Sequence, residues 1–432
     1  MPQPRRGRAL GLMFAAVCLV AINLRMTITG VGPLLDEIAA DRGTTPAALG
    51  ALVAIPLVAW GLVSPLAHSI AARWGAERAV GWSLVVLAAG TVWRSIPEGS
   101  LGLWFGTAVI GAALAISNVL MPAIIRSEFS ARIPLITGIY TALLGGFGAI
   151  SSALVVPISE SVVGGEPLGW RVALVATAAP IPLAIVVWII ATRRSPRRGH
   201  AASGAPRAVI VRGRVGRLIW RDAVAWSVAL YMGLQSLSFY IIAAWLAPIR
   251  ISQGSTAVEA GIEVAVYQVS GVLGSLALPL LYRGPLRRWL AALLPVGVAT
   301  SFAAIVLHVG PLPLWLAIAG FGSGASLSIS IMYLATKARE QTASSALSGM
   351  AQSVGYLIAA TGPVIFGFAY ELSGGWLAPL LVTLAFASAQ LVLGIAVGRD
   401  RRVLEQHPEV GADAADSAAA DSRRTANPDD PS

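Results

Sequence analysis

Residues 10–35 read LGLMFAAVCLVAINLRMTITGVGPLL, and this stretch decides the class of fold. It carries a single charge, Arg25, and follows the basic run Arg5-Arg6-Gly7-Arg8. A membrane helix needs about 20 mostly apolar residues to cross about 30 Å of hydrocarbon. A cleaved signal peptide is the competing interpretation, but the run is too long, lacks an A-x-A-like site and is soon followed by a second apolar run. The stretch therefore predicts an uncleaved first transmembrane helix.

The composition extends this prediction to most of the chain. Apolar residues make up 56% of the sequence and charged residues 12%, against about 45–50% and about 25% in soluble domains. The charges cluster between long uncharged stretches, as in membrane spans joined by loops. The sequence predicts an all-α integral membrane protein with twelve transmembrane helices, at 10–35, 46–71, 78–97, 101–125, 133–158, 169–192, 222–248, 257–282, 286–307, 311–335, 342–370 and 375–397.

The basic residues set the orientation of these helices. With the N-terminus inside, 26 of the 31 basic residues fall on the cytoplasmic side, and four fall outside, namely Arg42, Arg94, Arg171 and Arg250. This positive-inside bias predicts that both termini are cytoplasmic, in an inner (cytoplasmic) membrane. The net charge of +10 does not indicate nucleic acid, because the arginines lie in short runs between spans. Anionic lipids at the cytoplasmic face are the simpler partner.

The order of the spans divides the chain into four parts. Two six-helix bundles are predicted at 1–192 and 222–397, joined by a basic cytoplasmic linker at 193–221 with nine arginines. A tail at 398–432, rich in Ala, Asp, Ser and Pro, is predicted to be disordered. The bundles look like weak repeats: TGIYT at 137–141 and SGMAQ at 348–352 each precede a Gly-Trp pair, Gly169-Trp170 and Gly375-Trp376. Parallel six-helix repeats place the substrate site between the halves.

Several motifs add a family resemblance that covers nearly the whole membrane domain. The chain resembles the cyanate permease and 2-nitroimidazole transporter family of the major facilitator superfamily. The residues that carry the resemblance are Asn23-Leu24-Arg25 with 32–35 (GPLL), 118–122 (NVLMP), 232–236 (MGLQS) through Phe239-Tyr240, and 347–356 (LSGMAQSVGY). The resemblance implies the major facilitator fold and transport of a small solute by alternating access, and it is silent on the substrate.

One signature of the superfamily is degraded. The loop after the second span usually resembles G-x-L-x-D-R-x-G-R-R, and here it reads HSIAARWGAER at 68–78. Arg73 and Gly75 survive and are candidate gating residues, while Ala72 stands where the acid is expected. The departure at Ala72 argues against a gating salt bridge of the family type. It does not affect the fold that the resemblance implies.

Arg25 is the leading candidate for substrate contact. It lies about 22 Å along the helix from Leu10, inside the bilayer. Arginine does not deprotonate in proteins, so its charge must meet a partner or face a cavity. Two partners are open: an anionic or electron-rich substrate, or Glu263, whose depth in the eighth span is similar. Glu263 is also the candidate for coupling to a proton, and a purely structural ion pair at Arg25 is the alternative.

Uncharged polar residues within the spans complete the candidate site. Each is costly in hydrocarbon unless it is hydrogen-bonded, so the alternative for each is an inter-helix hydrogen bond or simple packing. The further candidates for substrate contact are Asn23, Asn118, Tyr140, Gln235, Tyr240, Gln268 and Gln352.

These features favour a secondary active transporter of a small anion, such as a cyanate-like ion, working as a monomer without a cofactor. Efflux of small aromatic or drug-like compounds, nitroimidazole-like, is the alternative. A non-transporting receptor or scaffold is less favoured, because short outer loops leave little room for a receptor domain. An enzyme is not expected, because no His, Asp or Glu cluster appears at the membrane surface.

The topology is testable with reporter fusions. Because 26 basic residues fall on one side and four on the other, fusions after residues 42 and 165 should report an outside location. Fusions after residues 205 and 400 should report an inside location. An outside signal at 205 would overturn the orientation.

Overall fold

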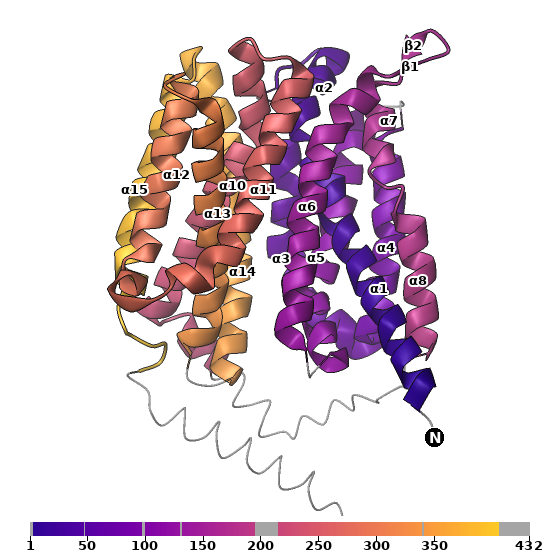
Figure 1. The fold of residues 1–432 in the computed structure, drawn as a ribbon, viewed down its shortest axis with the longest axis vertical. Coiled ribbons are helices and arrows are strands. Elements are labelled where there is room, and N and C mark those ends of the chain that lie inside the picture. Colours follow the sequence, from indigo (N-terminus) through magenta and orange to yellow (C-terminus); the bar gives the residue numbers. More distant parts are fainter. Residues whose placement is uncertain are drawn as a thin grey trace, which may run out of the picture.

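The structure is a computed structural model of the chain, and it describes residues 3–46, 48–96, 100–129, 132–194, 215–338 and 341–405. Two helical bundles stand side by side (Figure 1). The first contains α1 (Gln3–Thr29), η1 (Gly32–Leu34), α2 (Leu35–Arg42), α3 (Gly50–Trp74), α4 (Ala76–Arg94), α5 (Ser100–Glu128), α6 (Ile133–Glu160), β1 (Val162–Val163), β2 (Glu166–Pro167), α7 (Gly169–Ala176) and α8 (Ile181–Arg194). The second contains α10 (Ala223–Ser252), α11 (Ala257–Leu281), η2 (Gly284–Arg288), α12 (Leu290–Val306), α13 (Leu312–Thr336), α14 (Gln341–Ser373) and α15 (Leu377–Gly398).

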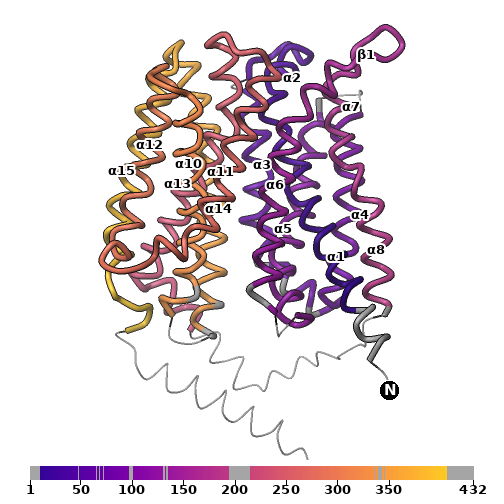
Figure 2. Tube along the Cα trace, in the orientation of Figure 1, coloured from indigo at the N-terminus to yellow at the C-terminus, as the bar shows by residue number. Residues whose placement is uncertain are grey.

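Each bundle crosses the molecule six times. The crossings are α1, α3, α4, α5, α6 and the α7–α8 pair in the first bundle, and α10 to α15 in the second (Figure 2). Among the described residues, nine segments are long and apolar enough to span a membrane. The other three crossings are α4 and two helices with shorter apolar stretches, Gly50–Ser64 and Leu290–Val306. The all-α architecture of two six-helix bundles is therefore the predicted one.

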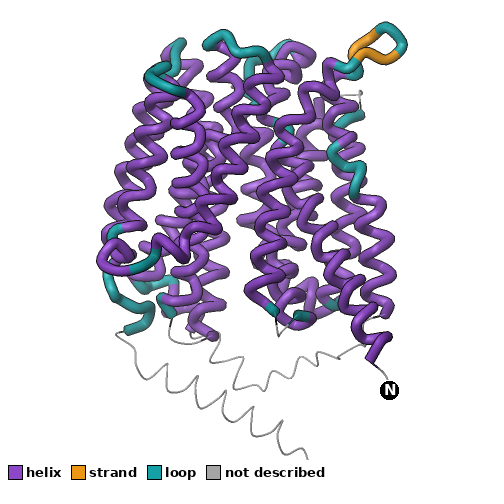
Figure 3. Tube along the Cα trace, in the orientation of Figure 1, coloured by secondary structure: helices purple, strands orange, loops and turns teal. Residues whose placement is uncertain are grey.

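The two ends of the bundles differ in the segments that they carry. The linker face is the end at which α1 begins and α8 ends, next to residue 215 where the chain resumes. The hairpin face is the opposite end, where the antiparallel pair β1–β2 projects (Figure 3). The hairpin was not predicted, and Gly164 and Gly165 make it possible because both adopt positive φ angles, +70° and +92°.

The first predicted span, 10–35, is broken rather than continuous. Helix α1 ends at Thr29, η1 follows, and α2 begins at Leu35. Proline has no backbone N–H, so Pro33 favours a new helical start. A Cβ at Gly32 would lie 2.6 Å from the carbonyl oxygen of Ala243 in α10, so the break brings the two halves into close approach.

The sixth predicted span, 169–192, is also interrupted. Helix α7 ends at Ala176 and α8 begins at Ile181, with a turn between them. Pro180 and Pro182 lack the N–H groups that a continuous helix would need there. At the hairpin face, the amide of Trp170 at the start of α7 donates to Glu37 Oε1 at 2.7 Å, which caps an otherwise unsatisfied N-terminus.

Two pairs of long helices join the halves. Helix α3 packs on α14, and α6 packs on α11. Small residues carry both contacts, since a Cβ at Gly61 would lie 2.7 Å from Leu357 and one at Gly261 would lie 2.8 Å from the carbonyl oxygen of Ser152. Close backbone approach through small residues is the usual way in which membrane helices associate.

The predicted tail needs a correction at its start. Residues 399–405 are bound to the second bundle: the amide of Val403 donates to the carbonyl oxygen of Lys337 at 2.9 Å. The amide of Leu404 donates to Asp222 Oδ2 at 2.8 Å, while Asp222 Oδ1 caps α10. The rest of the tail, 406–432, and most of the basic linker, 195–214, lie outside the described residues.

The packing of α11 on α13 predicts a sharp effect of one methyl group. A Cβ at Gly324 would overlap the carbonyl group of Gly271. Gly324→Ala should therefore force the helices apart at a cost of about 1–3 kcal/mol or more, seen as a lower Tm in detergent. The matched control is Gly349→Ala, because a Cβ there meets nothing within 4 Å and Ala is the better helix former by about 1 kcal/mol. Equal Tm values for the two variants would contradict this packing.

Candidate functional site

Arg25 lies in an aromatic cage between the halves. Its Nη1 donates to the hydroxyl of Tyr240 at 3.0 Å. Its Cζ lies 5.8 Å from the ring centres of Trp60 and Phe239 and 6.0 Å from that of Tyr240. A guanidinium within about 6 Å of ring centres is stabilised by cation–π attraction. Since Trp60 is in α3 and the other two rings are in α10, the cage joins the two bundles.

Two further tyrosines complete the cage. The rings of Trp60 and Tyr356 meet edge to face at 5.0 Å. The hydroxyls of Tyr140 and Tyr356 lie within electrostatic range of the Arg25 guanidinium. The buried indole N–H of Trp60 has no acceptor among the described residues, so it is an available donor in the cage. The site thus offers a cation, flat apolar surfaces and hydroxyl groups together.

No carboxylate neutralises Arg25 in the described part of the chain. The cage therefore provides only neutral partners, whose attraction is weaker than that of an anion at the same distance. A guanidinium presents N–H groups in a planar fork that fits carboxylates and similar oxyanions. The arrangement is suited to an anionic or electron-rich ligand that reaches this half-buried guanidinium.

Hydrogen bonds between α1 and α6 hold Arg25 in position. The hydroxyl of Thr29 donates to the carbonyl oxygen of Gly148 at 3.0 Å, and that of Ser151 donates to the carbonyl oxygen of Met26 at 2.8 Å. A Cβ at Gly148 would lie 3.5 Å from the Cβ of Arg25, so the helices approach closely beside the site. The small and hydroxylated residues of α6 therefore fix the register in which Arg25 faces the other half.

Gln268 joins the halves next to this contact. Its Nε2 donates to Ser152 Oγ at 2.7 Å, from α11 to α6. It is thus near Arg25 but fully engaged between helices. Tyr140 and Tyr240, predicted with Arg25, do lie with it. Trp60 was missed, because a tryptophan in an apolar span gives no sign of facing a charge.

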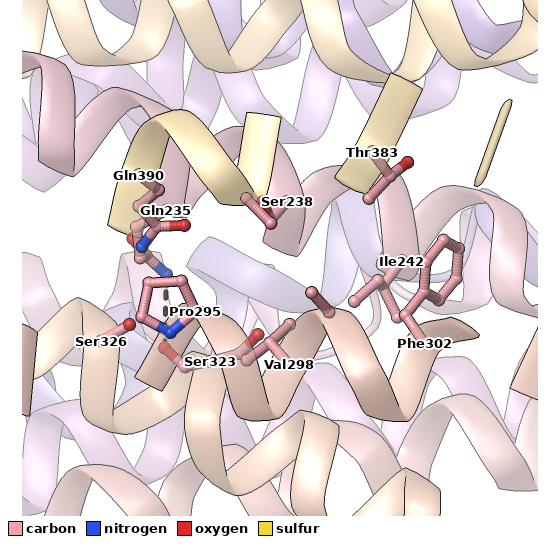
Figure 4. Close-up of a pocket in the computed structure, with 12 residues that line it drawn as sticks. Gln235, Ser238, Ile242, Pro295, Val298, Phe302, Ser323, Ser326, Thr383 and Gln390 are labelled. Atoms are coloured by element: carbon pink, nitrogen blue, oxygen red, sulfur yellow. Dashed lines mark hydrogen bonds between the residues drawn. The ribbon is translucent and has the colours of Figure 1, made fainter. Parts of the chain in front are cut away.

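Gln235 lies elsewhere, in a cavity inside the second bundle (Figure 4). Its Nε2 donates to the carbonyl oxygen of Ser323 at 3.3 Å, and its Oε1 accepts from Ser236. The cavity is about 10 Å³, which suits about one water. Gln390 and Thr383 of α15 also line this cavity. Gln235 is therefore not part of the Arg25 cage.

The remaining polar candidates do not converge on Arg25. Asn23 is fully buried within the first bundle, and its Nδ2 donates to the carbonyl oxygen of Leu19 one turn earlier in the same helix. Asn118 in α5 and Gln352 in α14 are half-buried. Among the described residues, no hydrogen bond brings either of these two to the cage.

The interpretation of Glu263 as a partner of Arg25 is wrong for this structure. Glu263 Oε2 accepts from Nε of Arg250 at 2.8 Å, and their side chains are 16% and 11% exposed. Arg250 is further held by Gln253 and Ser255. Both partners belong to the second bundle, so the pair does not bridge the halves. The sequence predicted similar depths for Arg25 and Glu263, but Glu263 lies beside Arg250. Arg25 lies beside Tyr240, ten residues before Arg250 in α10.

Arg73 and Gly75 lie far from the cage. Arg73 is exposed at the linker-face end of α3, about 20 Å along the helix from Trp60 of the cage. Gly75 has φ +87° and links α3 to α4, a conformation that L residues rarely adopt. This glycine is retained for the turn. Among the described residues, no group of three or more His, Cys, Asp or Glu is placed to hold a metal ion.

Two six-crossing membrane bundles with a charged aromatic site between them define a solute transporter. Residues 13–363 match the family model of the Major Facilitator Superfamily, and the chain belongs to this superfamily. It is a multi-pass membrane transporter and not an enzyme.

Curated relatives agree with the resemblance seen in the motifs. The chain is 35% identical to the 2-nitroimidazole transporter of Escherichia coli K12 over 91% of its own length and 96% of that protein. It is 25% identical to the cyanate transport protein CynX of the same organism over 84% and 91%. A bacterial homologue of the lysosomal transporter Spinster superposes with a TM-score of 0.73 at 16% identity, covering 92% of this chain and 98% of that one. The last likeness shows the shared fold.

The Glu263–Arg250 pair predicts a specific pattern of thermodynamic coupling. Thermal unfolding in detergent should show that Glu263→Gln and Arg250→Gln are not additive, with a coupling of about 0.5–3 kcal/mol. Glu263→Gln and Arg25→Gln should be additive, because these side chains are bound to other partners. Coupling between Glu263 and Arg25 as strong as that between Glu263 and Arg250 would contradict the observed pairing.

Proposed function

We propose that the protein is a secondary active transporter that moves a small anion, such as a cyanate-like ion, across the cytoplasmic membrane by alternating access. The observation that carries the proposal is the guanidinium of Arg25, held between the halves by aromatic rings and one neutral hydroxyl. A permanent charge inside a membrane protein is functional by default. An anion that enters the cage supplies the negative charge that no described side chain provides for Arg25.

The distribution of contacts between the halves supports alternating access. Toward the hairpin face the halves touch, as at Gly50 against Pro363 and in the hydrogen bond from Thr45 to Glu371 at 2.6 Å. Contact between the halves at this face is what one of two alternating states requires.

The sequence orients this face and suggests its partners. With the linker face in the cytoplasm, as the basic residues favour, the hairpin face at which the halves touch is the outer face. The arginines of 193–221 then face anionic lipid headgroups. Coupling to a proton through Glu263 requires that its bond to Arg250 opens during the cycle. The Thr45–Glu371 bond, which does join the halves, must break whenever the hairpin face opens.

Transport of a small nitro-substituted aromatic compound is the second candidate. It is favoured by the rings of Trp60, Phe239 and Tyr356 around Arg25, which can stack on a flat ligand. The relative named as a 2-nitroimidazole transporter points the same way. The two candidates differ in how strongly each needs the charge of Arg25.

Flux into proteoliposomes decides between the candidates. Arg25→Gln should abolish cyanate flux, because the ion loses its counter-charge, and Arg25→Lys should weaken it by about 10-fold or more as the fork is lost. Trp60→Leu should affect 2-nitroimidazole more than cyanate, since it removes a stacking surface but no charge. Arg287→Gln, at an exposed arginine on the linker face, is the control. Wild-type cyanate flux in Arg25→Gln would make Arg25 structural and defeat the proposal.

A further inference from the structure

A second arginine is buried without a counter-charge. Arg94 was counted with the charges on the outer side; it is the last residue of α4 and only 1% exposed. Its Nη1 donates to the carbonyl oxygen of Thr27 at 3.0 Å. Its Nε and Nη2 have no acceptor in the described part of the chain. Buried guanidinium N–H groups are almost always bonded, so these two call for a partner.

Packing forces Arg94 inward. Gly106 of α5 lies so close that a Cβ there would be 2.5 Å from the backbone nitrogen of Arg94. The end of α4 is therefore in close backbone contact with α5, and the side chain of Arg94 extends toward α1. The carbonyl that it binds, that of Thr27, belongs to the last turn of α1 just before the break at 30–31. Carbonyls in a last turn lack intrahelical partners and carry the negative end of the helix dipole.

Arg94 is one of the residues that line a cavity between the halves. The cavity is about 30 Å³, which suits about two waters or an ion of a few atoms. Its lining comes from α1, η1, α3, α4, α5 and α10 and includes Thr29, Arg94, Thr107 and Tyr240. None of its lining residues is acidic, so the cavity has a positive charge and no protein anion.

Tyr240 connects this cavity to the Arg25 cage. Its hydroxyl accepts the hydrogen bond from Arg25, which leaves its own proton available for donation. The same side chain lines the Arg94 cavity. The hydroxyls of Thr29 and Thr107 donate to backbone carbonyls, so Arg94 and Tyr240 are the donors that remain for a ligand.

We infer that the Arg94 cavity is a second binding site for a small anion, separate from the Arg25 cage and next to it on the side of the hairpin face. Nε and Nη2 form one planar edge of the guanidinium, which binds two acceptor atoms of a single ion side by side. The Tyr240 hydroxyl supplies a third donor. This inference rests on the proposed function in one respect, that the ion filling the site is the transported one.

The size of the cavity restricts the ligand. A volume of about 30 Å³ accommodates a compact ion such as cyanate or formate but not an aromatic ring in this state. The transported ion then has two successive positions, one at each arginine, along the path between the halves. A larger aromatic substrate would contact Arg25 only.

The test is a titration of the full-length protein in detergent with sodium cyanate and sodium formate, at constant ionic strength set with sodium gluconate. Thermal stabilisation reports binding, since a ligand of the folded state raises Tm in proportion to occupancy. Arg94→Gln should raise the apparent Kd of the site by about 10- to 100-fold, because charge-assisted bonds are lost. Arg25→Gln should retain this binding, and Arg287→Gln should match the wild type.

A second variant covers the case in which Arg94→Gln does not fold. Arg94→Lys keeps the charge and a donor for Thr27, but it lacks the planar edge, so it should fold and bind about 10-fold more weakly. If Arg94→Lys and the wild type bind both ions equally, the edge holds only water and the inference is wrong.

Flux separates this result from the proposed function. Suppose that the wild type moves cyanate into proteoliposomes and that Arg94→Lys binds cyanate as well as the wild type does. The proposed transport is then supported, and the second anion site is refuted. If cyanate binding depends on Arg94 but the wild type carries no cyanate, the second anion site is supported and the proposed transport of cyanate is refuted. Both results together, Arg94-dependent binding and wild-type flux, support two successive positions.

Discussion

The compensation of positive charge in an apolar interior is the constraint on which the centre of this molecule depends. Arg25 cannot release its proton, and the described spans provide it with no carboxylate. The protein instead surrounds it with ring faces and a hydroxyl, from Trp60, Phe239 and Tyr240. Because these rings come from both bundles, the charge that needs compensation lies where the two halves meet.

The break in the first helix, which Pro33 favours, helps to meet the same constraint at Arg94. A continuous helix over 10–35 would bond the carbonyl of Thr27 internally, but α1 ends at Thr29 and leaves that oxygen to Arg94. The break also brings Gly32 against the backbone of α10. One short segment without regular α-helix, 30–34, thus has three consequences. It ends α1, it lets the halves approach closely, and it leaves a carbonyl oxygen for the buried guanidinium of Arg94.

The sequence predicted the features that depend on composition and depth. Membrane spans are recognisable because every crossing must be apolar, and Arg25 stood out because it is charged at bilayer depth. Which side chains lie beside one another in the membrane was not predictable. Glu263 was predicted at a depth similar to that of Arg25, yet it binds Arg250. Arg94 was counted with the outer charges, and its burial against Gly106 and its bond to Thr27 were not predicted. Gln235 and Gln268 look alike in sequence, but the first lies within a bundle and the second between bundles.

The position of Tyr240 explains why two cationic sites can serve one ion. Two buried guanidinium groups repel each other, and that repulsion is strong in an interior of low dielectric constant. An anion bound to either arginine reduces it, so an ion that moves from one to the other exchanges one attraction for another of similar size. Tyr240 contacts Arg25 through its oxygen and lines the Arg94 cavity, so its hydroxyl can donate to the ion at either position. A single tyrosine can therefore keep the barrier between the two positions low, which favours passage over tight retention of the ion.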